Sequence, residues 1–174
     1  FFWQQLRSHP NYDEFWQKRG VLQHLKGIDH AMMTVGGWYD AEDLYGPLNT
    51  YRTIEENNPG AYNTIVMGPW SHGDWARKNG RQAIGNVYFG EGISEFFQKH
   101  IERNFFNYFL KDDYNGVNKL PEAYMFDTGK KRWSEFNTWP PEEAKTVSWY
   151  LRDDEKLSGT PPLSGEDEFT DFVS

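Results

Sequence analysis

The 174-residue sequence predicts an α/β fold, and three observations carry that prediction. Two short, continuously apolar runs, Ala31–Val35 and Thr64–Met67, each stop at a glycine, which is typical of strands buried on both faces of a sheet. Residues between them show the apolar spacing of a helix. A strand, a helix and a second strand within 37 residues make a βαβ unit, whose strands are parallel and whose crossover is right-handed in nearly all proteins. We therefore expect the first run to be a central parallel strand.

The helix of this unit is predicted to start near Ala41, because Asp40 stands directly before the apolar pattern and suits an N-cap. Residues 57–60 (NNPG) end it. Gly46 and Pro47 fall inside the pattern, so we expect a kink or a split there.

The other elements follow from spacing and turn residues. Two short helices are expected before Gly27, and a longer one over residues 94–110, where aromatic residues form a broad apolar stripe. The loop over residues 70–89 is long, as functional loops often are. After residue 116, short runs at 122–126, 132–136 and 146–151 predict strands of β-sandwich type, too few for a complete sandwich or jelly roll.

Composition narrows the class of protein. The 13 Phe, 10 Tyr and 8 Trp exclude a disordered chain. Acidic residues outnumber basic ones by 26 to 18, and no basic cluster exceeds Lys130–Arg132, so no nucleic-acid partner is expected. Because there is no cysteine, neither disulfides nor a thiolate metal site can form. No apolar run approaches the ~20 residues that cross a bilayer, so no membrane partner is expected.

Two polar residues follow the two predicted strands. Asp40 comes after the first and His72 after the second, and ligands of open α/β sheets bind beyond the carboxyl ends of the strands. An acid followed by a histidine in the chain is the order of the last two members of a Ser-Asp-His triad, in which the acid orients the imidazole. The pair is thus a candidate catalytic site.

Plainer interpretations stay open at this stage. Asp40 could simply cap a helix whose first turn holds Glu42 and Asp43, and His72 could be an ordinary loop histidine. A hard cation could bind these four residues together with Asp74, although no metal-binding spacing is present. The remaining histidines have no acidic or histidine partner at a recognisable interval and are expected to be structural: His9, His24, His30 and His100.

Two segments, residues 37–43 (GWYDAED) and 68–73 (GPWSHG), resemble the acid and base segments of the cocaine esterase-like, X-Pro dipeptidyl-peptidase superfamily of α/β-hydrolases, and in particular its α-amino acid ester hydrolase branch, which also includes glutaryl cephalosporin acylase-like enzymes. Residues 9–16 (HPNYDEFW) are similar to the exit of the family's helical cap. Residues 124–129 (YMFDTG), with Trp133, are similar to the entry of its jelly-roll domain.

The resemblance implies a domain plan. Residues 1–27 would end a helical cap, residues 28–113 would be the C-terminal part of an α/β-hydrolase domain, and residues 118–174 would start a β jelly-roll domain that is incomplete. Since no Gly-x-Ser-x-Gly occurs, we expect the nucleophilic serine to lie upstream of these residues and the chain by itself to be inactive.

The resemblance also implies roles. Asp40 would be the triad acid and His72 the general base of a serine hydrolase that cleaves acyl esters or amides, while Glu42 and Asp43 would hold the α-ammonium group of an amino acid ester or a β-lactam side chain. No cofactor and no metal are implied. An X-Pro dipeptidyl-peptidase of the same superfamily, or a non-catalytic binding or scaffold segment, remains the alternative. A small-molecule ester, amide or dipeptide is the expected partner, with a periplasmic or secreted location and a homo-oligomeric assembly.

Overall fold

The computed structural model describes residues 1–77, 80, 82–111, 120–152 and 156–163. The chain divides into two compact units, Phe1–Trp139 and Pro140–Ser174. No helix in the described ranges is long and apolar enough to cross a membrane.

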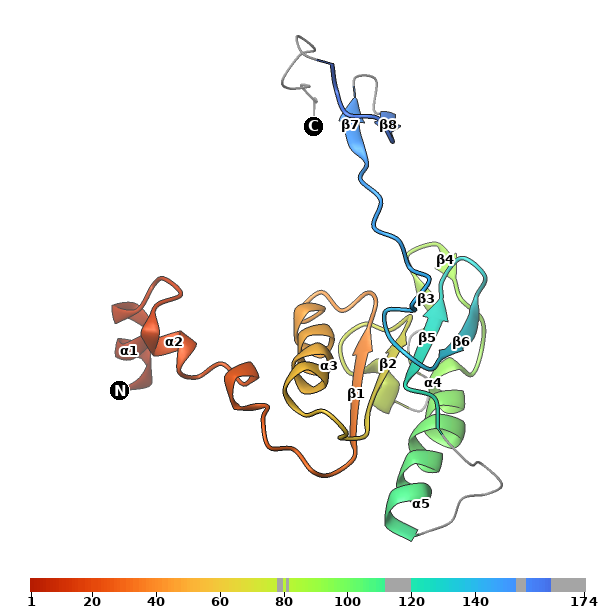
Figure 1. Cartoon of the computed structure of the whole chain (residues 1–174), viewed down its shortest axis with the longest axis horizontal. Coiled ribbons are helices and arrows are strands. Elements are labelled where there is room, and N and C mark those ends of the chain that lie inside the picture. Colours follow the sequence, from red (N-terminus) through yellow and green to blue (C-terminus); the bar gives the residue numbers. More distant parts are fainter. Residues whose placement is uncertain (78–79, 81, 112–119, 153–155, 164–174) are drawn as a thin grey trace. The chain divides into compact units, whose positions relative to one another are not determined.

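A four-stranded mixed sheet forms the centre of the first unit (Figure 1). Its strands lie in the order β1, β2, β5, β6, and the first three are parallel whereas β6 runs antiparallel to β5. The strands are β1 (Met32–Gly37), β2 (Asn63–Gly68), β5 (Ala123–Asp127) and β6 (Arg132–Phe136). The α/β class predicted from the sequence is confirmed.

The predicted βαβ unit is present, since helix α3 (Tyr45–Asn57) connects the parallel strands β1 and β2. All six residues of β2 are buried, as the apolar run predicted. The prediction that Ala31–Val35 is a central strand is wrong for the described sheet. Strand β1 lies at its edge, and only Gly36 and Gly37 of β1 are buried.

Helix α3 starts later than the sequence predicted. Its first residue is Tyr45, so Asp40 is not its N-cap and no helix begins near Ala41. The helix is also continuous through Gly46 and Pro47, which lie in its first turn, where the missing proline N–H has no intrahelical partner to lose. It ends at Asn57 as expected.

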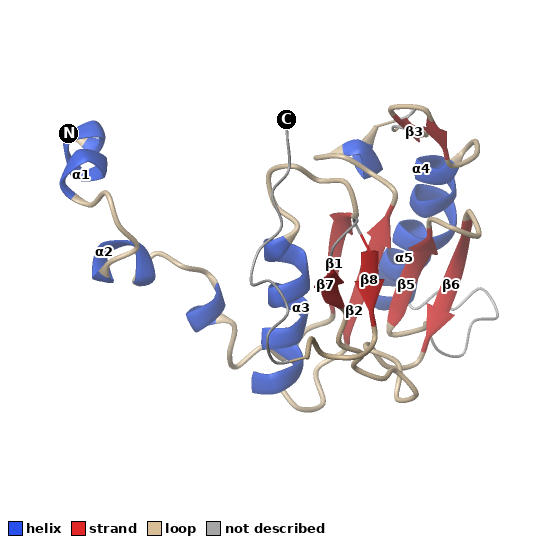
Figure 2. Ribbon diagram, turned by 90° about the horizontal axis from the view of Figure 1, so that it is seen from above, coloured by secondary structure: helices blue, strands red, loops and turns tan. Residues whose placement is uncertain are grey.

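The sheet is covered on both faces (Figure 2). Because side chains alternate along a strand, Ile65 and Met67 of β2 pack in the cluster that includes Tyr51 of α3, while Val66 packs on the opposite side. There the cover is a continuous helical stretch made of α4 (Ile93–Phe96), the π-helical turn η3 (Phe97–Glu102) and α5 (Arg103–Lys111). This stretch confirms the predicted long helix.

The first 27 residues contain the two predicted short helices, α1 (Phe2–Ser8) and α2 (Glu14–Gln17), followed by the 3₁₀ turn η1 (Leu22–His24). The expectation that His9 and His30 have no acidic partner is wrong. His9 Nδ1 lies 2.6 Å from Asp13 Oδ2, and the His9 ring stacks on Phe15. His30 Nδ1 lies 3.3 Å from Oδ1 of the preceding Asp29.

The long loop after β2 is partly ordered into secondary structure. It contains the 3₁₀ turn η2 (Asp74–Ala76) and a small hairpin of β3 (Ala83–Ile84) and β4 (Val87–Tyr88). The sequence predicts only a loop here, because a single 3₁₀ turn and two-residue strands show too little apolar periodicity to be recognised.

The strands after residue 120 differ from the expected separate β domain. The two runs at 122–126 and 132–136 become β5 and β6 of the α/β sheet, because β5 pairs in parallel with β2. The first compact unit therefore ends at Trp139, beyond the expected boundary between 113 and 118, which lies outside the described residues. In the second unit, β7 (Tyr150–Arg152) pairs with β8 (Lys156–Ser158), so the third predicted run forms a strand only from Tyr150.

Candidate active site

The carboxyl ends of β1 and β2 approach each other closely. Their last residues, Gly37 and Gly68, are register partners, and the Trp38 N–H donates to the Gly68 carbonyl at 2.8 Å. The Tyr39 N–H then donates to the Trp70 carbonyl at 3.0 Å. A side chain at Gly37 would place its Cβ 2.3 Å from that same carbonyl oxygen, so this approach requires glycine. The two loops that leave the strands are thereby held side by side.

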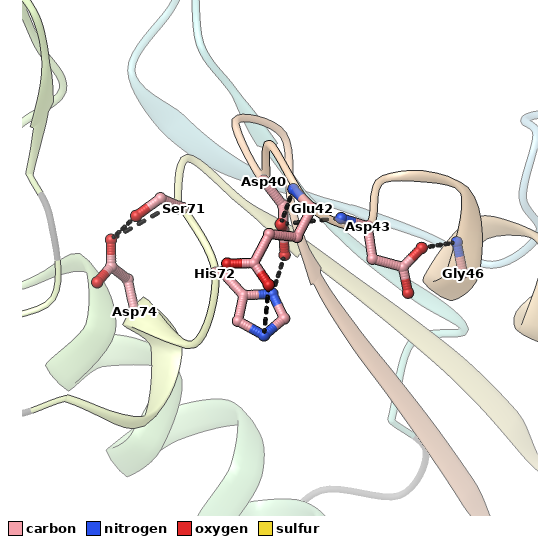
Figure 3. A network of polar contacts seen from close by, with 7 residues as sticks. All are labelled: Asp40, Glu42, Asp43, Gly46, Ser71, His72 and Asp74. Atoms are coloured by element: carbon pink, nitrogen blue, oxygen red, sulfur yellow. Dashed lines mark hydrogen bonds and ion pairs between the residues drawn. The ribbon is translucent and has the colours of Figure 1, made fainter. Parts of the chain in front are cut away.

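These loops bring Asp40 and His72 together (Figure 3). The distance from His72 Nδ1 to Asp40 Oδ2 is 2.9 Å, which confirms the predicted contact at this edge of the sheet. The two partners differ in exposure, since the Asp40 side chain is 3% exposed and the His72 side chain 56%. The pair therefore has a buried acid and an accessible imidazole.

Asp40 is fixed by a turn rather than by a helix. Its Oδ1 accepts from the backbone N–H groups of Glu42 at 2.9 Å and Asp43 at 3.0 Å, while Oδ2 faces His72. Burial opposes ionisation, but these hydrogen bonds outweigh it and lower the pKa of Asp40. Asp40 is thus an ionised, fully bonded carboxylate at neutral pH.

The imidazole of His72 has two distinct sides. Because an ionised carboxylate can only accept, Nδ1 carries the proton that is shared with Asp40, which leaves Nε2 free to take up a second proton. Nε2 lies 3.9 Å from Glu42 Oε2. The hydrogen bond to Asp40, followed by the negative charge of Glu42, raises the pKa of His72.

Glu42 and Asp43 occupy different environments. Asp43 Oδ1 accepts from the Gly46 N–H at 2.5 Å, which places this acid at the start of α3. The Glu42 side chain is 73% exposed and turns toward His72. The expectation that both project from the first turn of one helix is therefore wrong, since that helix begins at Tyr45.

A cavity of about 330 Å³ opens at this pair, with Asp40, Asp43, His72 and Trp75 in its wall beside residues of β1. Its volume is within the range of small-molecule sites. A larger cavity of about 490 Å³ is lined mainly by aromatic residues and includes neither Asp40 nor His72. We place the candidate site at the smaller cavity, because it holds the titratable pair.

Asp74 is not part of this cavity. Its carboxylate accepts from Ser71 and from Arg77, and it points away from His72 (Figure 3). The described residues contain no group of three or more His, Cys, Asp or Glu arranged to hold a metal ion, so the geometry gives no support to the metal interpretation.

Two family models match the chain. The X-Pro dipeptidyl-peptidase (S15 family) model matches residues 1–74, which include the Asp40–His72 pair. The model of the X-Pro dipeptidyl-peptidase C-terminal non-catalytic domain matches residues 115–174. The second match begins near the expected domain boundary at residue 118. The first two strands within this match, β5 and β6, nevertheless belong to the α/β sheet of the first unit.

Similar proteins agree with these matches. Cocaine esterase from Rhodococcus sp. (strain MB1 Bresler) is 26% identical over 147 residues, which are 84% of this chain and 24% of the esterase. A crystal structure of an aminopeptidase from a marine sediment Thaumarchaeota archaeon superposes with a TM-score of 0.82 and 32% identity, over 92% of this chain and 26% of the other. A selenomethionine-labelled α-amino acid ester hydrolase superposes with a TM-score of 0.83 and 27% identity, over 95% and 28%. The chain thus spans about a quarter of the length of each.

Fold and site together define an α/β protein that presents an Asp–His pair at the carboxyl edge of a parallel sheet. Together with the two family models and the similar proteins, these features show that the chain belongs to the superfamily of cocaine esterase-like proteins and X-Pro dipeptidyl-peptidases. The resemblance seen in the sequence is confirmed.

Proposed function

We propose that this chain supplies the acid and the general base of a serine hydrolase that cleaves acyl esters or amides through an acyl-enzyme. The observation that carries the proposal is the 2.9 Å hydrogen bond between the buried Asp40 carboxylate and Nδ1 of the accessible His72. A purely structural histidine would not need a free Nε2 at the wall of a cavity. The superfamily assignment supports the same reaction class.

In the proposed mechanism, Nε2 of His72 removes the proton from a serine hydroxyl as its oxygen attacks the substrate carbonyl carbon. His72 becomes an imidazolium, which Asp40 stabilises through the bond to Nδ1, and the proton then passes to the leaving alcohol or amine. Water repeats the sequence to release the acid. No Gly-x-Ser-x-Gly occurs among the 174 residues, so we place the serine in sequence upstream of them, and we expect the chain alone to be inactive.

We further propose that the substrate carries a free α-ammonium group, and that Glu42 is the main residue of this chain that binds it. Glu42 is largely exposed and lies beside Nε2 of His72, where the scissile bond would sit. A charge pair at about 4 Å is worth roughly 4 kcal/mol at surface-like dielectric before desolvation. Asp43 is a weaker candidate, because one of its oxygens already binds the Gly46 N–H.

A second candidate is an X-Pro dipeptidyl-peptidase, because the family model that covers Asp40 and His72 carries that description. Such an enzyme also selects a free amino terminus, so Glu42 serves both candidates. The two candidates differ in substrate preference. Comparing kcat/KM of the longer protein for an α-amino acid ester and for an X-Pro dipeptide amide would distinguish them.

The test of the substrate class is a substitution that removes the charge but keeps the shape. In the longer protein that contains the serine, Glu42→Gln should lower kcat/KM for a free α-amino ester by about 10-fold to 1,000-fold, and leave the matching ester without the amino group little changed. Glu14→Gln, at an exposed acid that pairs with Lys18, is the matched control and should change neither ester, while Asp43→Asn should lower the amino-ester rate less than Glu42→Gln does. An equal loss on both esters would reject ammonium binding by Glu42.

Assembly and location are also proposals. In the described sheet, β1 pairs with a strand on one side only, so its outer edge suits pairing with a further strand of the longer protein or with another copy. Light scattering of the chain should therefore show self-association, and a monomer of high thermal stability would count against it. Export to the periplasm or the medium remains our expectation from the resemblance.

A further inference from the structure

Asp74 is a buried carboxylate two residues after His72, and its bonds close the turn that carries His72. Its Oδ2 accepts from Ser71 Oγ at 2.6 Å and from the Ser71 N–H at 3.3 Å, while the Asp74 N–H donates to the Ser71 carbonyl at 3.2 Å. Figure 3 shows the carboxylate directed toward Ser71 and away from the imidazole. Three hydrogen bonds therefore join residues 71 and 74 around His72 and Gly73.

The closed turn is also fastened to helix α4. The hydroxyl of Ser94, a residue only 2% exposed, donates to the Asp74 carbonyl at 3.1 Å. Gly80 lies against this hydrogen bond and leaves no space for a side chain. A Cβ at residue 80 would clash with both Ser94 Oγ and the Asp74 carbonyl oxygen. Both the side chain and the backbone of Asp74 thus take part in fixing the turn.

The imidazole itself has few contacts that could fix it. Its side chain is 56% exposed, and the edge of Trp75 stands 6.4 Å away between ring centroids. Within the described part of the chain, the hydrogen bond to Asp40 orients the ring, while Glu42 Oε2 lies 3.9 Å from Nε2, beyond hydrogen-bond distance. Whether Nδ1 stays within reach of Asp40 therefore depends on the backbone of the turn.

We infer that Asp74 is a positioning residue, whose bonds to Ser71 and Ser94 hold the turn so that His72 Nδ1 stays within hydrogen-bond distance of Asp40 Oδ2. The inference rests on the proposed function, in which His72 is the general base. Among the described residues, Asp74 does not line the cavity at the Asp40–His72 pair, and its carboxylate is directed at Ser71 rather than at the imidazole (Figure 3), so we argue that it acts through the backbone. Arg77 Nη1, at 3.1 Å from Asp74 Oδ1, compensates the charge of the buried carboxylate.

The test is nuclear magnetic resonance of the 174-residue chain with ¹⁵N-labelled histidine, which needs no catalysis. The Nδ1–H proton of His72, bonded to Asp40, should be observed and protected from exchange with water. Asp74→Ala should speed its exchange about tenfold or more, because the turn opens more often. Ser71→Ala, which removes one bond, should have a smaller effect, and Asp74→Asn, which keeps an acceptor for Ser71, should restore part of the protection.

Asp127→Ala is the matched control. Asp127 also holds a turn, through the Lys130 N–H at 2.8 Å, so its loss should affect stability but leave the His72 proton unchanged. Folded Asp74→Ala and Ser71→Ala chains with the exchange rate of the unmodified chain would overturn the inference. If Asp74→Ala does not fold, Ser71→Ala and Asp74→Asn decide the matter. An unmodified chain without a protected Nδ1–H would instead contradict the Asp40–His72 pair and so the proposed function.

Discussion

Strands β1 and β2 bring Asp40 and His72 to the same edge of the sheet, yet the two strands differ in burial and in strand pairing. β2 is buried along its whole length and has strand partners on both sides. β1 is half-buried over its first four residues and, in the described sheet, pairs only with β2. The burial of the residues after each strand is reversed. Asp40, which follows the half-buried β1, is buried, and His72, which follows the buried β2, is exposed.

The buried Asp40 and the exposed His72 meet two different needs of the candidate site. A carboxylate that must stay ionised and oriented needs fixed donors, and Asp40 obtains them from the turn after β1 and from His72. An imidazole that exchanges protons with other groups needs an open Nε2 on a fixed backbone, and the loop after β2 supplies that backbone. The turn after β1, together with His72, therefore fixes the Asp40 carboxylate, whereas bonds to Asp74 and Ser94 fix the backbone that carries His72.

The strongest way to break this arrangement is to separate the two loops. Gly37→Ala would place a Cβ against the backbone carbonyl of the fully buried Trp70, which also accepts a hydrogen bond from the Tyr39 N–H. We expect a loss of about 3 kcal/mol in the free energy of unfolding, measured with urea. Gly129→Ala is the control, because a Cβ there meets only the Asp127 carboxylate at 3.4 Å, and it should cost less than about 1 kcal/mol. A similar cost at both glycines would contradict the close approach.

A matched pair of valines compares the two strands directly. Val35 of β1 and Val66 of β2 are register partners, but Val66 is fully buried and Val35 only partly. Val66→Ala should lower the free energy of unfolding by about 2 kcal/mol and Val35→Ala by less than about 1 kcal/mol. Equal losses would show that β1 is as deeply buried as β2, for example because another copy covers its edge.

The acid can be tested by pH. Hydrogen bonds hold the pKa of Asp40 below its ordinary value of 3.8, so its contribution to stability is present above that value and is lost as the pH falls through the lower pKa of the folded chain. In Asp40→Asn, the free energy of unfolding should therefore fall less steeply below about pH 5. Asp29→Asn, at a side chain 98% exposed, should leave the slope as it is. An unchanged slope in Asp40→Asn would contradict the bonded carboxylate.

The smallest expected effect concerns Glu42 and the base. Asp40 and Glu42 raise the pKa of His72 above 6.5, so the stabilisation is present below that value and is lost as the pH rises through the pKa of the folded chain. Glu42→Gln should lower the pKa of His72, as followed by magnetic resonance of its ring protons, with little change in stability. Glu14→Gln, which removes an acid paired with Lys18, is the control. An unchanged or higher pKa in Glu42→Gln would show that Glu42 does not face the imidazole.

Much of the first unit could be predicted because local signals and tertiary structure agree. The apolar run of β2, the end of α3 at residues 57–60 and the stripe of the long helix all gave correct elements. An apolar run does not say which strands will pair with it, so the edge position of β1 was missed. For the same reason β5 and β6 were expected in a separate domain, since short strands look alike in either sheet.

The candidate site was predictable to a similar degree. The contact between Asp40 and His72 followed from their positions after successive parallel strands. The pattern from Asp40 to Asp43 fits either a helix start or a closed turn. The bonds of the Glu42 and Asp43 N–H groups to Asp40 Oδ1 make it a closed turn, and the helix start comes later, where Asp43 accepts from the Gly46 N–H. The approach of Glu42 to Nε2 depends on a side-chain rotamer and could not be inferred from spacing.

The most direct test of the proposed triad role is the activity of a His72→Gln variant in a longer protein that also carries the proposed upstream serine. Our account predicts that kcat/KM for an activated ester falls by about 100-fold or more, because Nε2 is the base for the nucleophile. His100→Gln, in the π-helical turn η3, should retain the activity of the unmodified enzyme. A His72→Gln enzyme within a few-fold of the unmodified one would contradict the account.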